Sequence, residues 1–488
     1  MKPEKRIILC LAHMSGNEQK YIKEAFDTNW VVPLGPNVNG FEEDLKRFVA
    51  STDCSDRAES QSEKSNQGCG CAAKNSSKDT QLKKSNQGCG CAARDFSEES
   101  YPERIQPHEN DPDKLWLEGD ERLKDKQVVA LASGTAAVHL SLIGVGVKAG
   151  DEVICQSFTF CASSHPVTYL GAKPVFVDSE RDTWNMDPEL LETAIKDRVK
   201  KTGKKPKAII VVYLYGMPAK IEAIKAVADK YDIPLIEDAA EGLGSRYRGQ
   251  VCGTFGEYGV LSFNGNKMIT TSGGGALICP DEAARNNIMF YATQAREGYP
   301  YYQHEKIGYN YRLSNICAGI GRGQMTVLDE HIAHHRHIAR LYAEAFADID
   351  GIEFHDNPLP EMDSNFWLST ITIDPKLKIK GQENAYKSTV KSAVGGAAGV
   401  IHFVDNAHTD CEPNANVEAL RVWLDRANVE SRPLWKPMHK QPCYKDCAAY
   451  VNGVSEQLFK VGMCLPSGPL VTDADVTYIV ERIKEAIV

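Results

Sequence analysis

Short apolar runs alternate with helical patterns between residues 127 and 238, and this alternation constrains the fold more than any other feature. Runs without internal polar positions are typical of strands that are buried on both faces. Strands that alternate with helices predict βαβ units and a parallel sheet. We therefore expect an α/β fold whose strands lie in QVVALA (127–132), DEVICQS (151–157), PVFVD (174–178), KAIIVVYLY (207–215) and IPLIED (233–238).

Helical patterns dominate beyond residue 313. The stretch at 313–346 predicts one long helix or a kinked pair, and the remainder mixes short strands with helices. We expect a large domain at 1–325 and a smaller C-terminal α+β domain at 326–488.

Two segments are predicted to be insertions into this two-domain fold. The decapeptide KSNQGCGCAA occurs at 64–73 and again at 84–93, inside a polar stretch at about 52–112 that lacks the apolar residues of a core. A loop expansion is the favoured interpretation, but a metal or redox function of the CGC units stays open, although CxC spacing is a weaker zinc signal than CxxC. A second insertion is expected at about 376–414. The cysteines of the first are Cys54, Cys69, Cys71, Cys89 and Cys91.

Charge and hydropathy exclude several classes of protein. The 488 residues include 56 Lys and Arg against 66 Asp and Glu, a net charge of −10, which disfavours a nucleic-acid binder. No apolar run approaches the ~18 residues of a membrane span, and IILCLA near the N-terminus is too short for a signal-peptide core. We expect a cytoplasmic protein with no membrane or nucleic-acid partner, whose 15 cysteines are thiols.

Three motifs carry chemistry in combination. SGTAA (133–137) places a hydroxyl-rich turn before a helix, where a phosphate binds well. Asp238 ends an apolar strand, and Lys267 precedes a turn with three glycines. Each alone fits a structural role, as a helix cap or a solvated lysine. Together they are the parts of a pyridoxal-phosphate enzyme, in which a lysine forms a Schiff base and an acid pairs with the pyridine nitrogen.

The sequence resembles the DegT/StrS-type nucleotide-sugar aminotransferases, and the likeness covers nearly the whole chain apart from the two insertions. It implies the type I fold of pyridoxal-phosphate-dependent transferases, in which helices sandwich a mostly parallel sheet and a smaller α+β domain follows. The motifs that carry it are NWVVPLGPNVNGFEEDL (29–45), SGTAAVHLSL (133–142), GDEVICQSFTFCAS (150–163), GAKPVFVD (171–178), LYGMPAKI (214–221), IEDAAEGLGS (236–245), SFNGNKMITTSGGGAL (262–277), GYNYRLSNICAGIGRGQ (308–324), VESRPLWKPMHKQPCY (429–444) and CLPSG (464–468).

The resemblance implies roles around the cofactor ring. Lys267 would be the Schiff-base lysine, and Asp238 would bind the pyridine nitrogen. Phe160 would stack on the ring, and Glu241, where many relatives have Gln, would lie near the ring's 3-hydroxyl.

The resemblance also implies how the cofactor phosphate is held. Thr135, Ala136 and Ser262 would bind it within one subunit. Asn310 would reach the phosphate of the other subunit's cofactor, so a homodimer with shared active sites is expected.

The segment VESRPLWKPMH (429–439) is similar to the subgroup that aminates UDP-4-keto-6-deoxy-N-acetylhexosamines at C4, for amino-sugar glycans or exopolysaccharides. The expected amino donor is glutamate or a similar amino acid. Amination at C3, or of another nucleotide sugar, is the alternative within the family. Sugar dehydratases of this fold carry His in place of the lysine, and Lys267 disfavours them. The candidate substrate contacts, each of which could equally be a packing residue, are Trp30, Pro33, Asn37, Arg432, Trp435, Lys436 and His439.

Four histidines at 331, 334, 335 and 337 share a predicted helix, in which positions three and four apart lie on one face. This spacing would suit a metal, but a solvated helix rich in Arg and His is the favoured interpretation. We therefore predict no metal site.

Overall fold

The structure is a computed structural model that describes residues 3–51, 123–386 and 411–488. The predicted insertion at 52–112 lies outside the described residues, and so do its CGC repeats. Of the second predicted insertion, only 376–386 and 411–414 are described.

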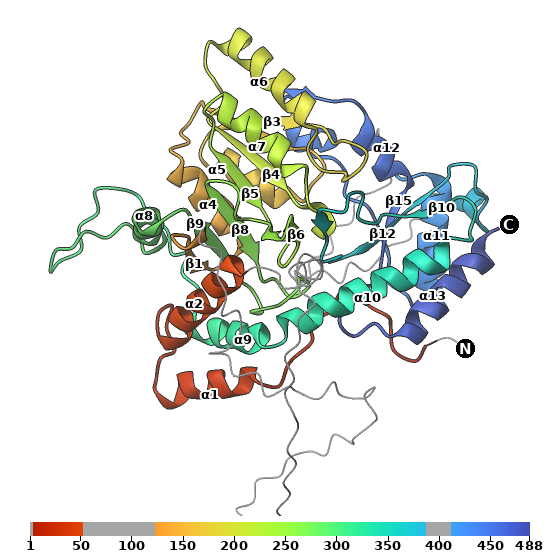
Figure 1. Cartoon of the computed structure of the whole chain (residues 1–488), viewed down its shortest axis with the longest axis horizontal. Coiled ribbons are helices and arrows are strands. Elements are labelled where there is room, and N and C mark those ends of the chain that lie inside the picture. The colour runs from red at the N-terminus through yellow and green to blue at the C-terminus, as the bar shows by residue number, and fades with distance from the viewer. Residues whose placement is uncertain (1–2, 52–122, 387–410) are drawn as a thin grey trace, which may run out of the picture. The chain divides into compact units, whose positions relative to one another are not determined.

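An eight-stranded mixed sheet forms the centre of the described chain, as the α/β prediction requires (Figure 1). Its strand order is β1-β9-β8-β5-β4-β2-β3-β14. The pairings from β8 to β14 are parallel, whereas β9 runs antiparallel to both β1 and β8. The strands are β1 (Gln127–Leu131), β2 (Glu152–Gln156), β3 (Lys173–Val177), β4 (Ala208–Val212), β5 (Leu235–Asp238), β8 (Tyr258–Ser262), β9 (Gly275–Cys279) and β14 (Ala449–Tyr450).

Helices cover both faces of this sheet, which explains the continuous apolar runs. Alternate residues of β4 enter different cores, Ala208 and Ile210 on one side and Ile209 and Val211 on the other. The first core is shared with α4 (Gly134–Gly144), α5 (His165–Tyr169) and α8 (Glu282–Ala292). The second is shared with α2 (Pro36–Ala50), α6 (Pro188–Thr202), α7 (Ile221–Lys230) and α9 (Asn315–Met325).

Local signals set the ends of these helices. The Asp187 side chain accepts hydrogen bonds from the backbone N–H groups of Glu189 and Leu190, and Pro188 occupies the first turn of α6. Gly203 ends α6 with φ 70°, the left-handed conformation that glycine adopts without strain.

The helical stretch after residue 313 is a kinked pair, one of the two forms predicted. It comprises α9 and α10 (Leu328–Phe346), and α1 (Glu18–Asp27) packs against α9. α10 leads to a third core beside an antiparallel sheet of order β10-β12-β15-β13. That sheet and its neighbours are β10 (Ile352–Phe354), β12 (Ser369–Ile373), β13 (Arg432–Pro433), β15 (Gly462–Leu465), α11 (Ala415–Arg426), α12 (Val454–Val461) and α13 (Asp473–Ala486).

The shorter elements connect these layers. A small antiparallel sheet, β11-β6-β7, comprises Met362–Asp363, Arg246–Tyr247 and Gln250–Val251. The single-turn 3₁₀ helices are η3 (Cys161–Ser163), η4 (Leu214–Gly216), η5 (Gln382–Asn384), η6 (Met438–Lys440) and η7 (Pro442–Tyr444).

The C-terminal region has its own sheet and core, yet it also supplies β14 to the edge of the central sheet beside β3. We keep the division at residues 325 and 326 as a proposal. Within the described residues, no helix is both long and apolar enough to cross a membrane.

Candidate active site

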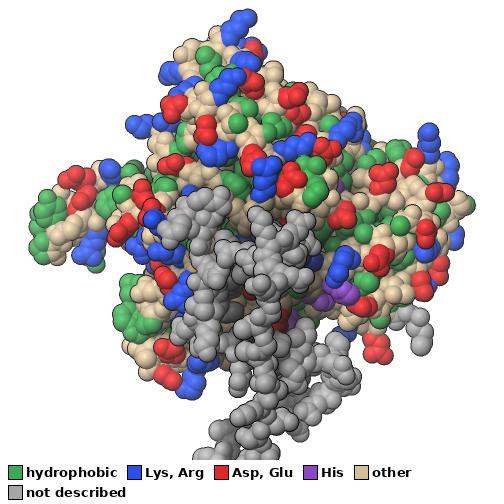
Figure 2. Space-filling view, viewed as in Figure 1, with side chains coloured by type: hydrophobic (Ala, Val, Ile, Leu, Met, Phe, Trp, Pro, Cys, Tyr) green, Lys and Arg blue, Asp and Glu red, His purple; other side chains and the backbone are tan. Residues whose placement is uncertain are grey.

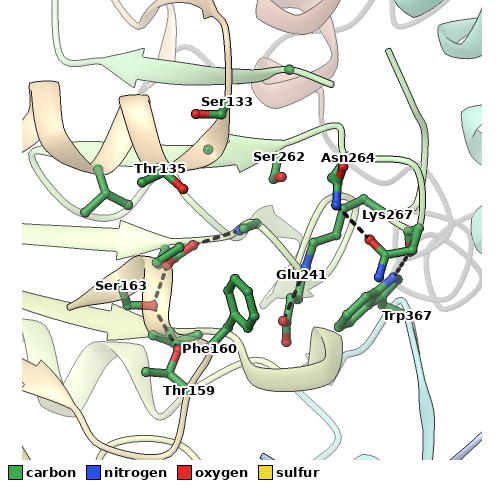
Figure 3. Close-up of a pocket in the computed structure, with 18 of the residues that line it drawn as sticks. Ser133, Thr135, Thr159, Phe160, Ser163, Glu241, Ser262, Asn264, Lys267 and Trp367 are labelled. Carbon is green, nitrogen blue, oxygen red and sulfur yellow. Dashed lines mark hydrogen bonds and ion pairs between the residues drawn. The ribbon is translucent and has the colours of Figure 1, made fainter. Parts of the chain in front are cut away.

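A cavity of about 230 Å³ opens at the carboxyl ends of β1, β4, β5 and β8 (Figure 3). Parallel strands of α/β sheets place ligands at this edge. Seven of the residues predicted from the sequence line the cavity: Thr135, Phe160, Asp238, Glu241, Ser262, Lys267 and Trp435.

The N-terminus of α4 forms one end of the cavity. The Ser133 hydroxyl caps this helix by accepting the backbone N–H of Ala136 at 3.1 Å. The first N–H groups of a helix have no intrahelical partner, and the helix dipole favours an anion there. The hydroxyls of Thr135 and Ser262 lie beside this end. Ala136 itself does not line the cavity, and its N–H is donated to the Ser133 hydroxyl.

Asp238 is buried at the end of β5, and one carboxylate oxygen accepts the Ser163 hydroxyl at 2.7 Å. Ser163 in turn accepts the Thr159 hydroxyl at 2.8 Å, and the other Asp238 oxygen accepts the Ala240 N–H at 3.2 Å. Burial raises the pKa of Asp238, and these hydrogen bonds and the nearby Lys267 charge oppose that shift. The carboxylate is thus held in one orientation and gains from a cationic partner in the cavity.

Lys267 lies in the loop between β8 and β9, with its side chain 13% exposed. Its Nζ is 3.3 Å from Glu241 Oε1 and 3.8 Å from the centroid of the Trp367 ring. Burial raises the pKa of Glu241, and the charge of Lys267 opposes the shift. The amine is therefore enclosed between a carboxylate and an aromatic face.

Two aromatic side chains form the opposite wall. Phe160 is half exposed, and its ring centroid is 5.6 Å from that of Trp435. The backbone N–H of Trp435 donates to the Tyr215 hydroxyl at 2.7 Å, and the N–H of Tyr215 donates to Glu241 at 2.8 Å. This wall is therefore connected by hydrogen bonds to the carboxylate beside Lys267.

Comparisons with known proteins identify the family of this chain. The DegT/DnrJ/EryC1/StrS aminotransferase family matches residues 120–411 and 400–484. EpsN of Bacillus subtilis, provisionally named a pyridoxal phosphate-dependent aminotransferase, is 39% identical over 484 residues, which cover 98% of this chain and 95% of EpsN. The chain belongs to the DegT/DnrJ/EryC1/StrS aminotransferase family. It is a nucleotide-sugar aminotransferase that depends on pyridoxal phosphate.

Two further matches are a curated relative and a solved structure. The GDP-perosamine synthase of Escherichia coli O157:H7 is 32% identical over 355 residues, 73% of this chain and 84% of that protein. A DegT DnrJ EryC1 StrS aminotransferase from Brucella abortus, known from its crystal structure, has the same fold with a TM-score of 0.69 and 23% identity, over 96% of this chain and 95% of that one.

The cavity fits the cofactor of this family. An anion site at the start of α4, a buried carboxylate at Asp238 and an amine at Lys267 match the phosphate, the ring nitrogen and the aldehyde of pyridoxal phosphate. When bound, the cofactor supplies an electron sink for the bonds of an attached amine. The chain contributes the anion site, the fixed carboxylate and an amine that can carry a proton.

Three predicted substrate contacts from the C-terminal segment do not line the cavity. Arg432 forms an ion pair with Glu430 at 2.7 Å. The ring Nδ1 of His439 is 2.7 Å from the Ser157 hydroxyl, and Lys436 lies between His439 and Trp435 in the chain. Only Trp435 of this segment reaches the cavity.

The predicted contacts from the N-terminal segment and Asn310 also lie outside the cavity of the single chain. Trp30 and Pro33 are exposed in the link between α1 and α2. Asn37 is buried, and its amide N–H donates to the Tyr21 carbonyl at 2.9 Å. Asn310 is exposed and pairs with Thr293 at the base of the loop that follows α8.

Sequence reasoning missed several residues that line the cavity. Ser163 and Thr159 orient Asp238, yet nothing distinguishes them from other hydroxyl residues of the chain. Trp367 follows Lys267 by 100 positions and has no motif of its own. The remaining polar lining residues are Ser133, Asn264 and Asn266.

The predicted solvated histidine helix is wrong for two of its residues. His331 and His335 are buried on the inner face of α10, and their Nδ1 atoms bond the Met268 and Phe366 carbonyls at 3.2 and 3.1 Å. Burial lowers the pKa of His331 to about 4 and that of His335 to about 3. Among the described residues, no three His, Cys, Asp or Glu side chains are grouped so as to hold a metal ion.

Proposed function

We propose that this enzyme moves an amino group from an amino-acid donor, glutamate, to C4 of a UDP-4-keto-6-deoxy-N-acetylhexosamine, for amino-sugar glycan or exopolysaccharide synthesis. The observation that carries the proposal is the position of the segment 429–439, whose Trp435 forms a wall of the cavity. This is the segment whose sequence resembles the C4 subgroup.

Two hydrogen bonds support the placement of that segment. The Met438 N–H donates to the Ser157 carbonyl at 2.8 Å, and the Trp435 N–H donates to Tyr215 at 2.7 Å. Arg432, Lys436 and His439 therefore lie on a strip of chain that is anchored beside the cavity. Their cationic and aromatic groups suit a nucleoside diphosphate, whose charge favours Arg and Lys.

The roles around the cofactor are part of the proposal. Lys267 is proposed as the Schiff-base lysine and, once released, as the group that moves the substrate's proton. Asp238 keeps the ring nitrogen protonated, and Glu241 holds the amine of Lys267. Phe160 stacks on the ring.

The phosphate is proposed to rest on the start of α4, between Thr135 and Ser262. Ala136 contributes through its place in the first turn, since its own N–H is already donated to the Ser133 hydroxyl.

A second copy of the chain is proposed to complete the site. The loop between α8 and α9 extends away from the sheet (Figure 1), and its exposed side chains include Tyr301, Tyr302 and Ile307, which are 59%, 77% and 84% exposed. Figure 2 shows hydrophobic side chains at the tip of this loop. Asn310 stands at its base, so a homodimer would bury these side chains and bring Asn310 to the partner's phosphate. Trp30 and Pro33 lie on a second exposed apolar strip.

The test is a substrate screen that follows release of 2-oxoglutarate from glutamate. UDP-linked and GDP-linked 4-keto-6-deoxy sugars and a UDP-linked 3-keto sugar are compared, with Lys267→Ala as the inactive control, and NMR of the product locates the new amine. Preferred use of the UDP-4-keto-N-acetyl sugar supports the proposal. Amination only at C3, or only of the GDP sugar, the nucleotide named in the perosamine synthase relative, contradicts it.

A further inference from the structure

Trp367 contacts Lys267, although it comes from a segment 100 residues further along the chain. Trp367 is 1% exposed, and the centroid of its ring lies 3.8 Å from Lys267 Nζ. Figure 3 shows the lysine side chain between this ring and Glu241.

Hydrogen bonds fix the ring in this place. Its indole N–H donates to the Asn266 carbonyl at 2.6 Å, one residue before the lysine. The Trp367 backbone N–H donates to the buried Asn365 side chain at 2.8 Å. The same Asn365 amide donates to the Glu241 carbonyl at 2.9 Å, so one side chain holds both residues that contact the amine.

We propose that Trp367 is a positioning residue for Lys267, whose ammonium rests on the indole face, beside the Glu241 carboxylate, whenever the amine is not bonded to the cofactor. The face of an indole is electron-rich and attracts a cation, and the attraction strengthens where water is excluded. Lys267 is largely shielded from water at this point.

The contact matters because lysine carries its charge on a flexible four-carbon stem. A proton-carrying group acts only within hydrogen-bond reach of the atom it serves. A ring locked against the main chain at Asn266 keeps the free amine inside the cavity and limits its possible directions. Trp367 thus acts through Lys267, without reacting itself.

The first experiment measures the amine in the protein stripped of cofactor. Brief acetylation with dilute acetic anhydride, followed by peptide mass mapping, gives the labelling rate of Lys267 relative to the other lysines. Trp367→Met, which keeps an apolar side chain but removes the ring, should raise this rate about 5–30-fold. That range corresponds to the free energy of a cation–π contact shielded from water. Trp367→Phe, which keeps a ring face, should stay within about threefold of the wild type.

Trp423 provides a matched control away from the cavity. Its indole N–H also donates to a backbone carbonyl, that of Arg482 at 2.9 Å, and its face lies 5.6 Å from Lys380. Trp423→Met should leave the labelling of Lys267 unchanged.

A kinetic measurement tests the consequence for the reaction. With the amino donor that the wild type uses fastest among the common amino acids, Trp367→Met should lower kcat about 5–30-fold and change KM less than about threefold. Trp367→Phe should recover most of kcat, and Trp423→Met should retain it.

A measurement on the wild-type protein keeps the proposal falsifiable if Trp367→Met does not fold. With ¹³C at lysine Cε, the Lys267 signal in the cofactor-free protein is assigned by its loss in Lys267→Ala. Ring current from the indole should place it upfield of the other lysines. A Lys267 signal among the exposed lysines, equal labelling of the Met and wild-type proteins, or equal losses for Phe and Met would overturn the proposal.

Discussion

The two sides of the cavity are built differently. On the cofactor side, Ser133, Asp238 and Ser262 stand at the ends of β1, β5 and β8, so the strand order of one sheet fixes their spacing. On the opposite side, Trp367 and Trp435 arrive from distant parts of the chain and are each held by one or two hydrogen bonds to backbone, amide or hydroxyl groups. The cofactor side is set by topology, and the other side by a few polar contacts.

The difference has a consequence for substrate choice. Changing a residue at the strand ends of the sheet would disturb the proposed contacts to the cofactor. Residues of the other wall can change with little effect on the sheet, because loops carry them. Specificity for a sugar is therefore expected to reside on the Trp435 side.

The largest effect is expected for Lys267→Ala. Losing both the covalent link and the proton carrier should lower turnover by at least about 10²–10⁴-fold, the contribution typical of general acid–base groups. Borohydride reduction of the yellow wild-type protein should leave the cofactor on Lys267 in a peptide map. A reduced adduct on any other lysine contradicts the assignment of the cofactor side.

The next largest effect is expected for Asn310→Ala, which tests whether the cofactor site needs a residue from the partner subunit. Asn310→Ala should weaken binding of the cofactor about 10–100-fold, because a hydrogen bond to a charged group contributes about 1.5–3 kcal/mol. Co-expression with Lys267→Ala should restore part of the activity, since one site of each heterodimer then carries both intact residues. Heterodimers no more active than the Asn310→Ala protein would show that Asn310 serves its own subunit.

Ser157→Ala tests whether the two walls can be separated. Ser157 directly follows strand β2 and also binds the segment that carries Trp435. Its hydroxyl lies 2.7 Å from His439 Nδ1 and accepts the His439 backbone N–H at 3.2 Å. Loss of these bonds should raise KM for the sugar about 5–10-fold, equivalent to about one hydrogen bond, and leave the cofactor dissociation constant unchanged. An equal rise in KM for the sugar and in the cofactor dissociation constant would mean that the two walls act as one unit.

The pH dependence of stability tests one residue of the cofactor side, Asp238. Burial raises the folded-state pKa of Asp238 above its unfolded value of about 3.9. Its contribution to stability is therefore complete below that value and is lost as the pH rises through the folded pKa. In the cofactor-free protein, Asp238→Asn should thus gain in Tm relative to the wild type as the pH rises above about 4, as thermal unfolding would show. A Tm difference that does not vary with pH contradicts this account.

The smallest effect is expected for deletion of residues 54–110 with a short Gly/Ser bridge. The composition of that segment predicts no core, and a long insertion adds little to the cost of closing a loop. Turnover should stay within about twofold and the midpoint of thermal unfolding nearly unchanged. Stoichiometric zinc or iron that disappears with the deletion would instead favour a thiol function for the CGC repeats.

The cofactor side was predictable from the sequence because its signals are local. A buried strand followed by SGTAA, an acid at the end of a strand and a lysine near glycines each occupy a few consecutive positions. The sheet order then brings them together, and the cavity contains all three.

The other side was not predictable, because its residues meet only after the chain has folded. Nothing near Trp367 or Asn365 in the sequence indicates Lys267 as a neighbour. The same limit applies to His331 and His335, since spacing shows that they share a helix face but not that packing buries that face. Asn37, a predicted substrate contact, lies outside the cavity of the single chain, where its side-chain amide donates to the Tyr21 carbonyl.

The strand β14 has a consequence for how the chain can be made. Ala449 and Tyr450 pair with Phe176 and Val177, so the edge of the central sheet is finished by residues near the C-terminus. During synthesis on the ribosome, the outer edge of β3 stays unpaired until those residues emerge, and open edges invite pairing with other chains. A truncated product that ends at residue 325 would keep that edge open permanently, and newly made chains are expected to be most prone to aggregation in the interval before β14 is added.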